Sequence, residues 1–302
     1  MSAIASTAAL LEDVFPGSAV GQVEYLRWLY QGSPFGEVIE ANLDDELGRA
    51  GHYALVPIKL ARDGRDIPGA LSLNTAVHER ARGGGTFVRL AELAIADARS
   101  RGVRAVVGVA NASSTPGFLR RLGFELLAPL PARILLPTPG SGAGFQSAWA
   151  DLGALAGDRL MQGAEQMLAP PETGEARLWN VETLKWRLSR PAARYAVHRA
   201  EDVLAVSRAE RRSGVRVAVL LKVLARRELG ARERGALVRA ACRFHRAPLA
   251  LHVGLNRNVS FPGLPLPDRL RASPLNLIYR SLEEPLRPGS IVDFEFLDFD
   301  AY

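Results

Sequence analysis

Cysteine is almost absent from this chain, since Cys242 is the only one among 302 residues. A single cysteine excludes a disulfide within the chain, and a small apolar helix position is its expected role. Long apolar runs are absent as well. No stretch approaches the roughly 18 residues that a membrane span needs, and the N-terminus has no positively charged region of the secretory kind. These absences predict a cytoplasmic protein with no membrane partner.

Histidine and lysine are also scarce. The five histidines are scattered without the paired spacing of metal ligands, which predicts that no metal is bound. Lysine occurs three times among 38 basic residues, and the net charge of +6 comes from residues 151–302, which carry 24 basic and 18 acidic side chains. This excess could attract tRNA, an anionic membrane surface or the phosphates of an activated substrate. A solvated, arginine-rich surface is the simpler explanation, because aromatic residues are not interleaved with the arginines.

A glycine-rich segment, residues 80–87, lies between a predicted strand and a predicted helix. The strand, residues 70–77, is apolar and partly β-branched, and the helix, residues 86–101, has apolar residues at helical spacing. Glycines without Cβ allow backbone N–H groups to approach an anion, and the first N–H groups of a helix are unpaired at the positive end of its dipole. The segment therefore predicts a pyrophosphate-binding loop.

Residue identities exclude two common phosphate loops at this place. The dinucleotide fingerprint needs a third glycine where Val88 stands, and the Walker loop needs a Gly-Lys-Ser/Thr end that is missing. The pattern that remains is Arg/Gln-x-x-Gly-x-Gly, carried by Arg80, Gly83 and Gly85.

The residues after the loop continue the pattern. A second buried strand is predicted over residues 104–111 and ends in Asn111, and a short helix follows over residues 117–122. The sequence Gly-Phe-Glu comes next, at residues 123–125. In this order and spacing, residues 50–136 resemble the two core motifs of the GNAT (Gcn5-related N-acetyltransferase) superfamily.

The resemblance implies an α/β fold of the α+β kind, with a mixed, mostly antiparallel sheet flanked by helices, and an acyl-CoA co-substrate, most simply acetyl-CoA. The loop N–H groups would hold the pyrophosphate with charge added by Arg80, and the end of the preceding strand would face the pantetheine arm and polarise the thioester carbonyl. Asn111 either contacts the CoA arm or caps the following helix. The implied binding residues are Thr75, Ala76, Val77, Arg80, Arg82, Gly83, Gly84, Gly85, Thr86 and Asn111.

The catalytic residues are less well defined. His78 and Glu79, directly before the loop, are the nearest candidates for the general base, although both also fit solvent-facing positions at a strand end. Many GNAT enzymes have a tyrosine that protonates the departing thiolate, but Leu119 stands at that position here. Either the thiolate leaves without direct help, or a hydroxyl such as Ser113 or Ser114 takes over.

Breaks in regular structure indicate the domain organisation. Prolines and glycines interrupt residues 137–144 and again residues 170–174, and the stretch between them, residues 148–168, has a helical apolar rhythm. We therefore expect a CoA-binding GNAT domain over residues 1–140, a linker containing a helix over 141–176, and a second domain over 177–302.

Two internal similarities predict a tandem duplication. The helix-like segment 26–30 is similar to 184–188, and the strand-like segment 107–111 is similar to 252–256, at offsets of 158 and about 145 residues. Where the second copy should have its phosphate loop, residues 226–233 carry side chains in place of glycines. The second half is therefore expected to be a degenerate GNAT-like domain that walls the substrate cleft and does not hold CoA in the usual way.

The second half is predicted to contain strands around a helix at residues 233–245. The predicted strands are residues 203–206, 215–224, 249–255, 275–279 and 291–299. Acidic and apolar residues alternate over residues 293–300, which indicates a solvated edge strand or, alternatively, a pocket for a cationic amine.

The sequence thus predicts an acyl-CoA-dependent N-acyltransferase that transfers an acyl group to a small-molecule amine by direct attack in a ternary complex. Two alternatives remain open. One is a FemABX-like transferase that takes its aminoacyl group from tRNA, which the basic second half would permit. The other is a non-catalytic GNAT-fold protein that binds acyl-CoA, which the missing tyrosine would explain.

Overall fold

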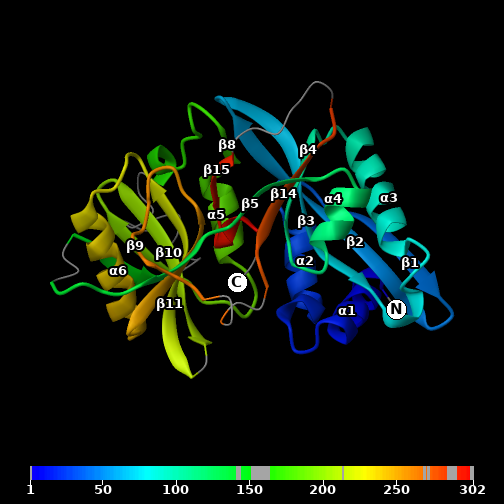
Figure 1. Ribbon diagram of the computed structural model, residues 1–302, viewed down its shortest axis with the longest axis horizontal. Helices are drawn as coiled ribbons and strands as arrows, with labels where there is room; N and C mark the ends of the chain where they lie inside the picture. Colours follow the sequence, from blue (N-terminus) through cyan, green and yellow to red (C-terminus); the bar gives the residue numbers. More distant parts are fainter. Residues whose placement is uncertain are drawn as a thin grey trace. The chain divides into compact units, whose positions relative to one another are not determined.

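The computed structural model describes residues 2–140, 144–150, 164–212, 214–267, 270, 273–283 and 291–299. The chain divides into two compact units (Figure 1). Unit 1 consists of Met1–Pro129 and Pro274–Ser290, and unit 2 of Leu130–Ser273 and Ile291–Tyr302. The chain thus changes unit three times, whereas the sequence predicted one linker. Most of the predicted linker helix, residues 151–163, lies outside the described residues.

Unit 1 contains a mixed sheet in the order β1-β2-β3-β4-β14-β5, in which β3 and β4 are parallel and all the other pairs are antiparallel. Its strands are β1 (Ile39–Asp45), β2 (Gly48–Arg62), β3 (Arg65–Val77), β4 (Ala105–Ala110), β5 (Glu125–Pro129) and β14 (Asn276–Ser281). Its helices are α1 (Ala3–Val14), α2 (Val23–Gln31), α3 (Thr86–Ser100) and α4 (Thr115–Arg121), with short 3₁₀ turns η1 (Ala19–Gly21) and η2 (Glu79–Ala81).

The core of unit 1 follows from the alternation of side chains along β2. Tyr53 and Leu55 face α3, where Leu90 and Ala94 are buried at helical spacing. His52, one residue earlier, points to the other face and contacts Tyr30 of α2. Helices therefore cover both faces of the sheet, which confirms the predicted fold class.

Unit 2 has a second mixed sheet in the order β7-β9-β10-β11-β12-β6-β13, and β15 pairs with the end of β12 and with β8. Its strands are β6 (Ala132–Leu135), β7 (Gln146–Trp149), β8 (Glu175–Arg177), β9 (Ala196–Ala200), β10 (Val203–Arg212), β11 (Val215–Ala225), β12 (Leu249–Leu255), β13 (Leu264–Pro265) and β15 (Ile291–Glu295). Its helices are α5 (Val181–Leu188) and α6 (Ala231–His245), with 3₁₀ turns η3 (Ala164–Met167) and η5 (Phe296–Asp298).

The same order of elements recurs in the two units. In unit 1, β1, β2 and β3 are antiparallel neighbours, and α3 connects β3 to the parallel strand β4. In unit 2, β9, β10 and β11 are antiparallel neighbours, and α6 connects β11 to the parallel strand β12. The two similar sequence pairs found above fall on matching elements, α2 with α5 and β4 with β12.

Strand β14 corrects one sequence-based prediction. Residues 275–279 were expected to form a strand of the second half, but β14 joins the sheet of unit 1, where it lies between β4 and β5 (Figure 1). Its centre, Leu277 to Tyr279, is completely or almost completely buried, as expected for a strand in the interior of a sheet. Strand β6 occupies the corresponding place beside β12 in unit 2. The apolar pattern of a strand predicts that it is buried, but it does not identify the sheet that the strand joins.

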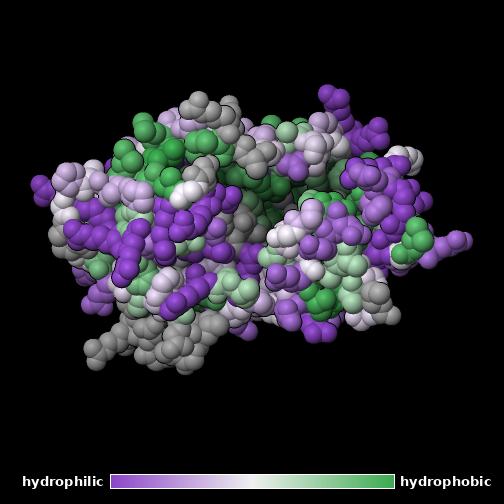
Figure 2. All heavy atoms as spheres, turned by 90° about the horizontal axis from the view of Figure 1, so that it is seen from below, coloured by the Kyte–Doolittle hydropathy of each residue, from purple (hydrophilic) through white to green (hydrophobic). Residues whose placement is uncertain are grey.

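Hydrophilic residues cover much of the face of the molecule that Figure 2 shows, with smaller apolar areas between them. Within the part of the chain that the structure describes, no helix has both the length and the apolar character needed to cross a membrane.

Two buried histidines of unit 2 share a serine between them. The Ser207 hydroxyl lies 2.7 Å from Nε2 of His198 and 2.7 Å from Nε2 of His245, and Ser147 approaches Nδ1 of His198 at 2.7 Å. Burial lowers the pKa of His198 to about 3 and the pKa of His245 to about 4. Both imidazoles are therefore neutral at pH 7.

We expect unit 2 to lose stability below about pH 6.5, the ordinary pKa of histidine in an unfolded chain. Below that pH the unfolded state binds protons that the folded state does not, so the free energy of unfolding falls by about 2 kcal/mol per histidine between pH 7 and pH 5. Denaturant midpoints from tryptophan fluorescence at the two pH values measure this loss. The variant His198→Gln/His245→Gln should depend less on pH, and an unchanged dependence would contradict the assignment.

Candidate functional site

Strands β3 and β4 separate in the middle of unit 1. Their parallel pairing ends at Ser72 and Gly108, and β3 continues from residue 73 to Val77 without a partner in β4. In this part β3 has a bulge, because Asn74 and Thr75 together oppose the single residue Tyr53 of β2. The gap between two diverging parallel strands leaves backbone groups available for a ligand.

The glycine loop follows directly after β3. Gly83, Gly84 and Gly85 all have positive φ angles, of 92°, 55° and 76°. A Cβ atom built on any of them would meet nothing within 4 Å, so the backbone conformation and not lack of space requires glycine here. Gly85 is the N-cap of α3, whose first turn contains no acidic residue. The positive end of the helix dipole is therefore not neutralised by the chain itself.

A pocket of about 430 Å³ opens at this helix end. The loop and the first turn of α3 form one wall, α4 forms another, and Val77 at the end of β3 also belongs to the lining. Three arginines contribute to the lining, Arg82 from the loop and Arg120 and Arg121 from α4. The pocket thus combines a helix N-terminus with three guanidinium groups, which is a suitable environment for a pyrophosphate.

The sequence analysis missed Arg120 and Arg121. A signal for them was present, because they follow Pro116 and Gly117 by about one helical turn and so share a face of α4 with these two lining residues. Finding them required knowing which face of α4 turns toward the loop.

Aromatic packing fixes that face. Phe87 at the start of α3 packs edge-on against Phe118 of α4 with 5.2 Å between ring centroids, and Phe118 packs in the same way on Phe124 at 5.0 Å. A Cβ on Gly117 would lie 3.0 Å from the Phe87 ring, so glycine allows this close approach. Phe124 of the Gly-Phe-Glu sequence thus belongs to the aromatic contacts that position the two helices lining the pocket.

Arg80 and Arg82 make different contacts. Arg80 donates to both carboxylate oxygens of Asp45, at 2.7 and 3.3 Å, and this bond lowers the pKa of Asp45. Arg80 therefore links the loop to the end of β1. It is not among the residues that line the pocket. Arg82 lines the pocket and donates through Nε to the carbonyl of Val77 at 3.2 Å.

Of the remaining predicted binding residues, Thr86 is in the lining of the pocket, whereas Thr75, Ala76 and Asn111 are not. Thr86 lines it and donates its hydroxyl to the Gly83 carbonyl at 3.2 Å. Thr75 belongs to the bulge, and Ala76 pairs with His52 of β2. The Oδ1 atom of Asn111 accepts from the Ser114 N–H at 2.9 Å and from the Ser113 hydroxyl at 2.8 Å, so its carbonyl closes the turn before α4.

The two candidate bases lie at the start of η2, between β3 and the loop, with His78 as its N-cap and Glu79 as its first residue. His78 caps this turn, since its Nδ1 accepts from the Arg80 N–H at 3.3 Å. Glu79 is highly exposed and pairs with Arg82 at 3.7 Å. The structure thus shows a local structural role for each of them.

Leu119, where the resemblance implied a proton-donating tyrosine, is half-buried against the apolar core of unit 1. The hydroxyls of Ser113 and Ser114 both bond to Asn111 within the turn. Neither serine therefore stands out as a replacement proton donor.

The corresponding helix end in unit 2 is occupied by the chain's own carboxylate. Glu233, in the first turn of α6, accepts from the N–H of Gly230 at 2.9 Å. Arg227 donates to both oxygens of the same carboxylate, at 3.0 and 2.7 Å. An anion would have to displace Glu233, in contrast to the open helix end in unit 1.

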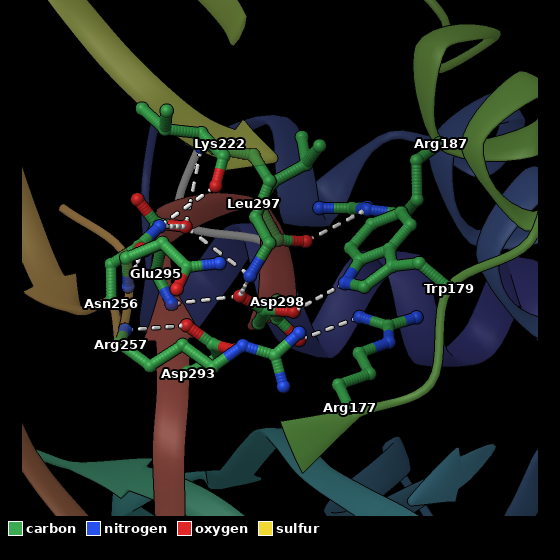
Figure 3. A network of polar contacts seen from close by, with 12 residues as sticks. Arg177, Trp179, Arg187, Lys222, Asn256, Arg257, Asp293, Glu295, Leu297 and Asp298 are labelled. Carbon is green, nitrogen blue, oxygen red and sulfur yellow. Dashed lines mark hydrogen bonds and ion pairs between the residues drawn. The ribbon is translucent and has the colours of Figure 1, made fainter. Parts of the chain in front are cut away.

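In unit 2, side chains of the chain itself fill the split between β11 and β12. Their pairing ends at Leu220 and His252. Beyond that point Asn256 donates to the Val223 carbonyl at 2.7 Å and to Glu295 at 3.1 Å, and the Val223 N–H donates to Glu295 at 3.3 Å (Figure 3). The cavity that remains there has a volume of only about 30 Å³. These contacts fit the expectation that unit 2 does not hold CoA in the usual way.

The buried cluster in Figure 3 corrects the prediction for residues 293–300. Lys222 of β11 lies 2.8 Å from Asp298 and 3.2 Å from Glu295, and neither carboxylate is exposed. Burial alone would lower the pKa of Lys222, but the charges of Asp298 and Glu295 raise it above its usual value. Trp179 donates to Asp298 at 2.7 Å. Glu295 and Asp298 therefore belong to a buried ion cluster and not to a solvated edge strand, while residue 300 lies outside the described residues.

No group of three or more metal-ligating side chains occurs in the part of the chain that the structure describes.

Comparison with known proteins agrees with the geometry. Residues 2–127 match the family model of the acetyltransferase (GNAT) domain. No curated protein sequence matches the chain at a significant level. A GCN5-related N-acetyltransferase from Anabaena variabilis has a similar structure, with a TM-score of 0.66 and 12% identity, over 93% of this chain and 70% of that chain.

Two further solved structures are similar. A GCN5-related N-acetyltransferase from Kribbella flavida has a TM-score of 0.61 and 17% identity, over 93% of this chain and 69% of that chain. The N-myristoyltransferase of Saccharomyces cerevisiae, solved with bound myristoyl-CoA, has a TM-score of 0.55 and 11% identity, over 95% of this chain and 85% of that chain. At these identities the likeness concerns the fold.

Proposed function

We propose that this protein is an acyl-CoA-dependent N-acyltransferase that acts on a small-molecule amine, because residues 2–127 match the family model of the acetyltransferase (GNAT) domain. The observation that carries the proposal is the pocket at the start of α3. There a helix N-terminus without a side-chain cap, a loop of three positive-φ glycines and three arginines come together beside the split between β3 and β4.

The chain's own residues suit each part of such a co-substrate. The N–H groups of the loop and Arg82, Arg120 and Arg121 would hold the pyrophosphate. The unpaired edge of β3 after Ser72 would accompany the pantetheine arm into the split. A bound acyl-CoA supplies a thioester whose acyl group passes to the amine nitrogen while the sulfur leaves as the CoA thiolate. The recurring order of elements supports our further proposal that unit 2 arose by duplication and lost this site.

Calorimetric titration with acetyl-CoA and a series of longer acyl-CoAs tests the proposal. We expect one site per chain in unit 1, and the tightest ligand would identify the acyl chain. Binding followed by thiol release with amino sugars or amino acids would support the enzyme. Binding with no turnover on any amine would favour the non-catalytic alternative. No binding to any acyl-CoA, together with salt-sensitive binding of tRNA, would favour the aminoacyl-tRNA-dependent alternative.

We propose His78, or else Glu79, as the general base. If His78 is the base, His78→Ala should slow thiol release by about 100-fold while acetyl-CoA binding is kept. His78→Asn separates this role from capping, because an asparagine side chain can still accept the Arg80 N–H but cannot take up a proton. Both variants should be slow if His78 is the base. Normal turnover in His78→Asn would remove the assignment.

A further inference from the structure

A chain of hydrogen bonds, buried at its centre and partly buried at its ends, crosses unit 1 on the α2 side of the sheet. The Tyr30 hydroxyl, at the C-terminal end of α2, lies 2.9 Å from Nε2 of His52 in β2. The His52 Nδ1 atom lies 2.7 Å from Oδ1 of Asn42 in β1. At the other end, the side-chain amide of Asn74 in β3 donates to the Tyr30 hydroxyl at 3.3 Å. The contacts join three adjacent strands to one helix.

The protons in this chain have one consistent arrangement. Burial lowers the pKa of His52 to about 3, so its imidazole is neutral. Because Oδ1 of Asn42 is an acceptor, Nδ1 of His52 donates to it and Nε2 accepts from the Tyr30 hydroxyl. The Tyr30 oxygen in turn accepts from Asn74. Tyr30 and His52 are both almost completely buried, so neither can exchange these partners for water.

The chain ends on the strained residue of the β3 bulge. Asn74 has a φ angle of 50°, in the left-handed region that is strained for residues with a Cβ atom. Asn74 lies two residues beyond Ser72, where β3 leaves β4, and three residues before Val77 in the pocket lining. A bulge redirects backbone groups, so the conformation of Asn74 decides where the N–H and C=O groups of the split point.

We propose that Tyr30 is a positioning residue, which with His52 and Asn42 holds the bulge at Asn74 in the conformation that aims the backbone of β3 at the acyl thioester. This inference rests on the proposed acyl-CoA function. A hydrogen-bond donor polarises a carbonyl effectively when its direction is fixed before the ligand binds. The strained Asn74 backbone keeps its conformation because its side chain is hydrogen-bonded to Tyr30.

The test is the infrared carbonyl stretch of [1-¹³C]acetyl-CoA bound to the wild-type protein and to Tyr30→Phe, together with the dissociation constant of each. We expect the stretch to lie lower in the wild-type complex than in free acetyl-CoA and to move back toward the free value in Tyr30→Phe. The dissociation constant should change by no more than about threefold, because the pocket at α3 is untouched. Tyr279→Phe is the matched control, since it removes another buried tyrosine hydroxyl of unit 1, one that accepts from Arg62 at 2.8 Å.

A double variant makes the assignment specific. Asn74→Gly removes the side-chain bond but accepts a positive φ, so Tyr30→Phe should add no further shift in that background. The same carbonyl stretch in the wild type, Tyr30→Phe and Tyr279→Phe would overturn the positioning role while leaving acyl-CoA binding intact. Failure of the wild type to bind acetyl-CoA at all would overturn the proposed function and this inference with it.

Discussion

Gly84→Glu is expected to abolish acetyl-CoA binding, with the dissociation constant raised by at least about 100-fold, or about 2.7 kcal/mol. Two effects add. The φ of Gly84 is 55°, which strains any residue with a Cβ atom, and the new carboxylate would lie beside the helix N-terminus that should hold the pyrophosphate. In unit 2 a carboxylate already occupies the corresponding helix end, because Glu233 lies at the N-terminus of α6.

Calorimetric titration of the variant with acetyl-CoA measures this loss, and two further variants make it interpretable. Gly64→Glu places the same side chain at another glycine of unit 1 with a positive φ, 73°, in the turn between β2 and β3 and with open space around it. We expect it to bind like the wild type. Gly84→Ala keeps the strain without the charge and should have an intermediate affinity. Equal affinities for Gly84→Glu and Gly64→Glu would show that the glycine loop is not the binding site.

Lys222→Met is expected to destabilise unit 2 by about 3–5 kcal/mol, the usual result of removing one partner from a buried ion cluster. The ammonium lies within 3.2 Å of both Glu295 and Asp298, and all three side chains are buried. Burial alone would raise the pKa of Glu295, but Lys222 and the bond from His252 hold it below its usual value. Without Lys222, two carboxylates remain buried with no cation between them, and one must take up a proton or the cluster must open.

Denaturant unfolding followed by tryptophan fluorescence measures this change, since Trp179 bonds to Asp298 in the cluster. Lys185→Met on α5 is the matched control in the same unit, because Lys185 is only half-buried, and its effect should stay within about 0.5 kcal/mol. Adding Glu295→Gln and Asp298→Asn to Lys222→Met should recover part of the loss. A Lys222→Met variant as stable as Lys185→Met would contradict the role of the cluster.

Local patterns in the sequence determined the parts of unit 1 that depend on near neighbours. The sequence predicted a strand, a helix and a strand over residues 70–77, 86–101 and 104–111. They form the end of β3, α3 and β4, and the boundaries next to the glycine loop agree within one residue. The glycine loop was also recognised, because three adjacent glycines with positive φ are a requirement of the backbone and so appear directly in the sequence. Apolar periodicity and glycine placement are properties of a short window, which is why they can be read without the fold.

Only the tertiary structure decided which segments meet. Strand β14 enters the sheet of unit 1 from 166 positions after β4 ends, as the pairing of Asn276 with Ala110 shows, and no local pattern records this. Arg120 and Arg121 become pocket residues because aromatic packing turns α4 toward the loop. The acidic residues at 295 and 298 were expected on a solvated edge strand or in a pocket for a cationic amine, yet both are buried and pair with Lys222. Burying a charge costs much free energy unless a partner of opposite charge lies beside it. Here the partner comes from a strand distant in the sequence and is brought there by the fold.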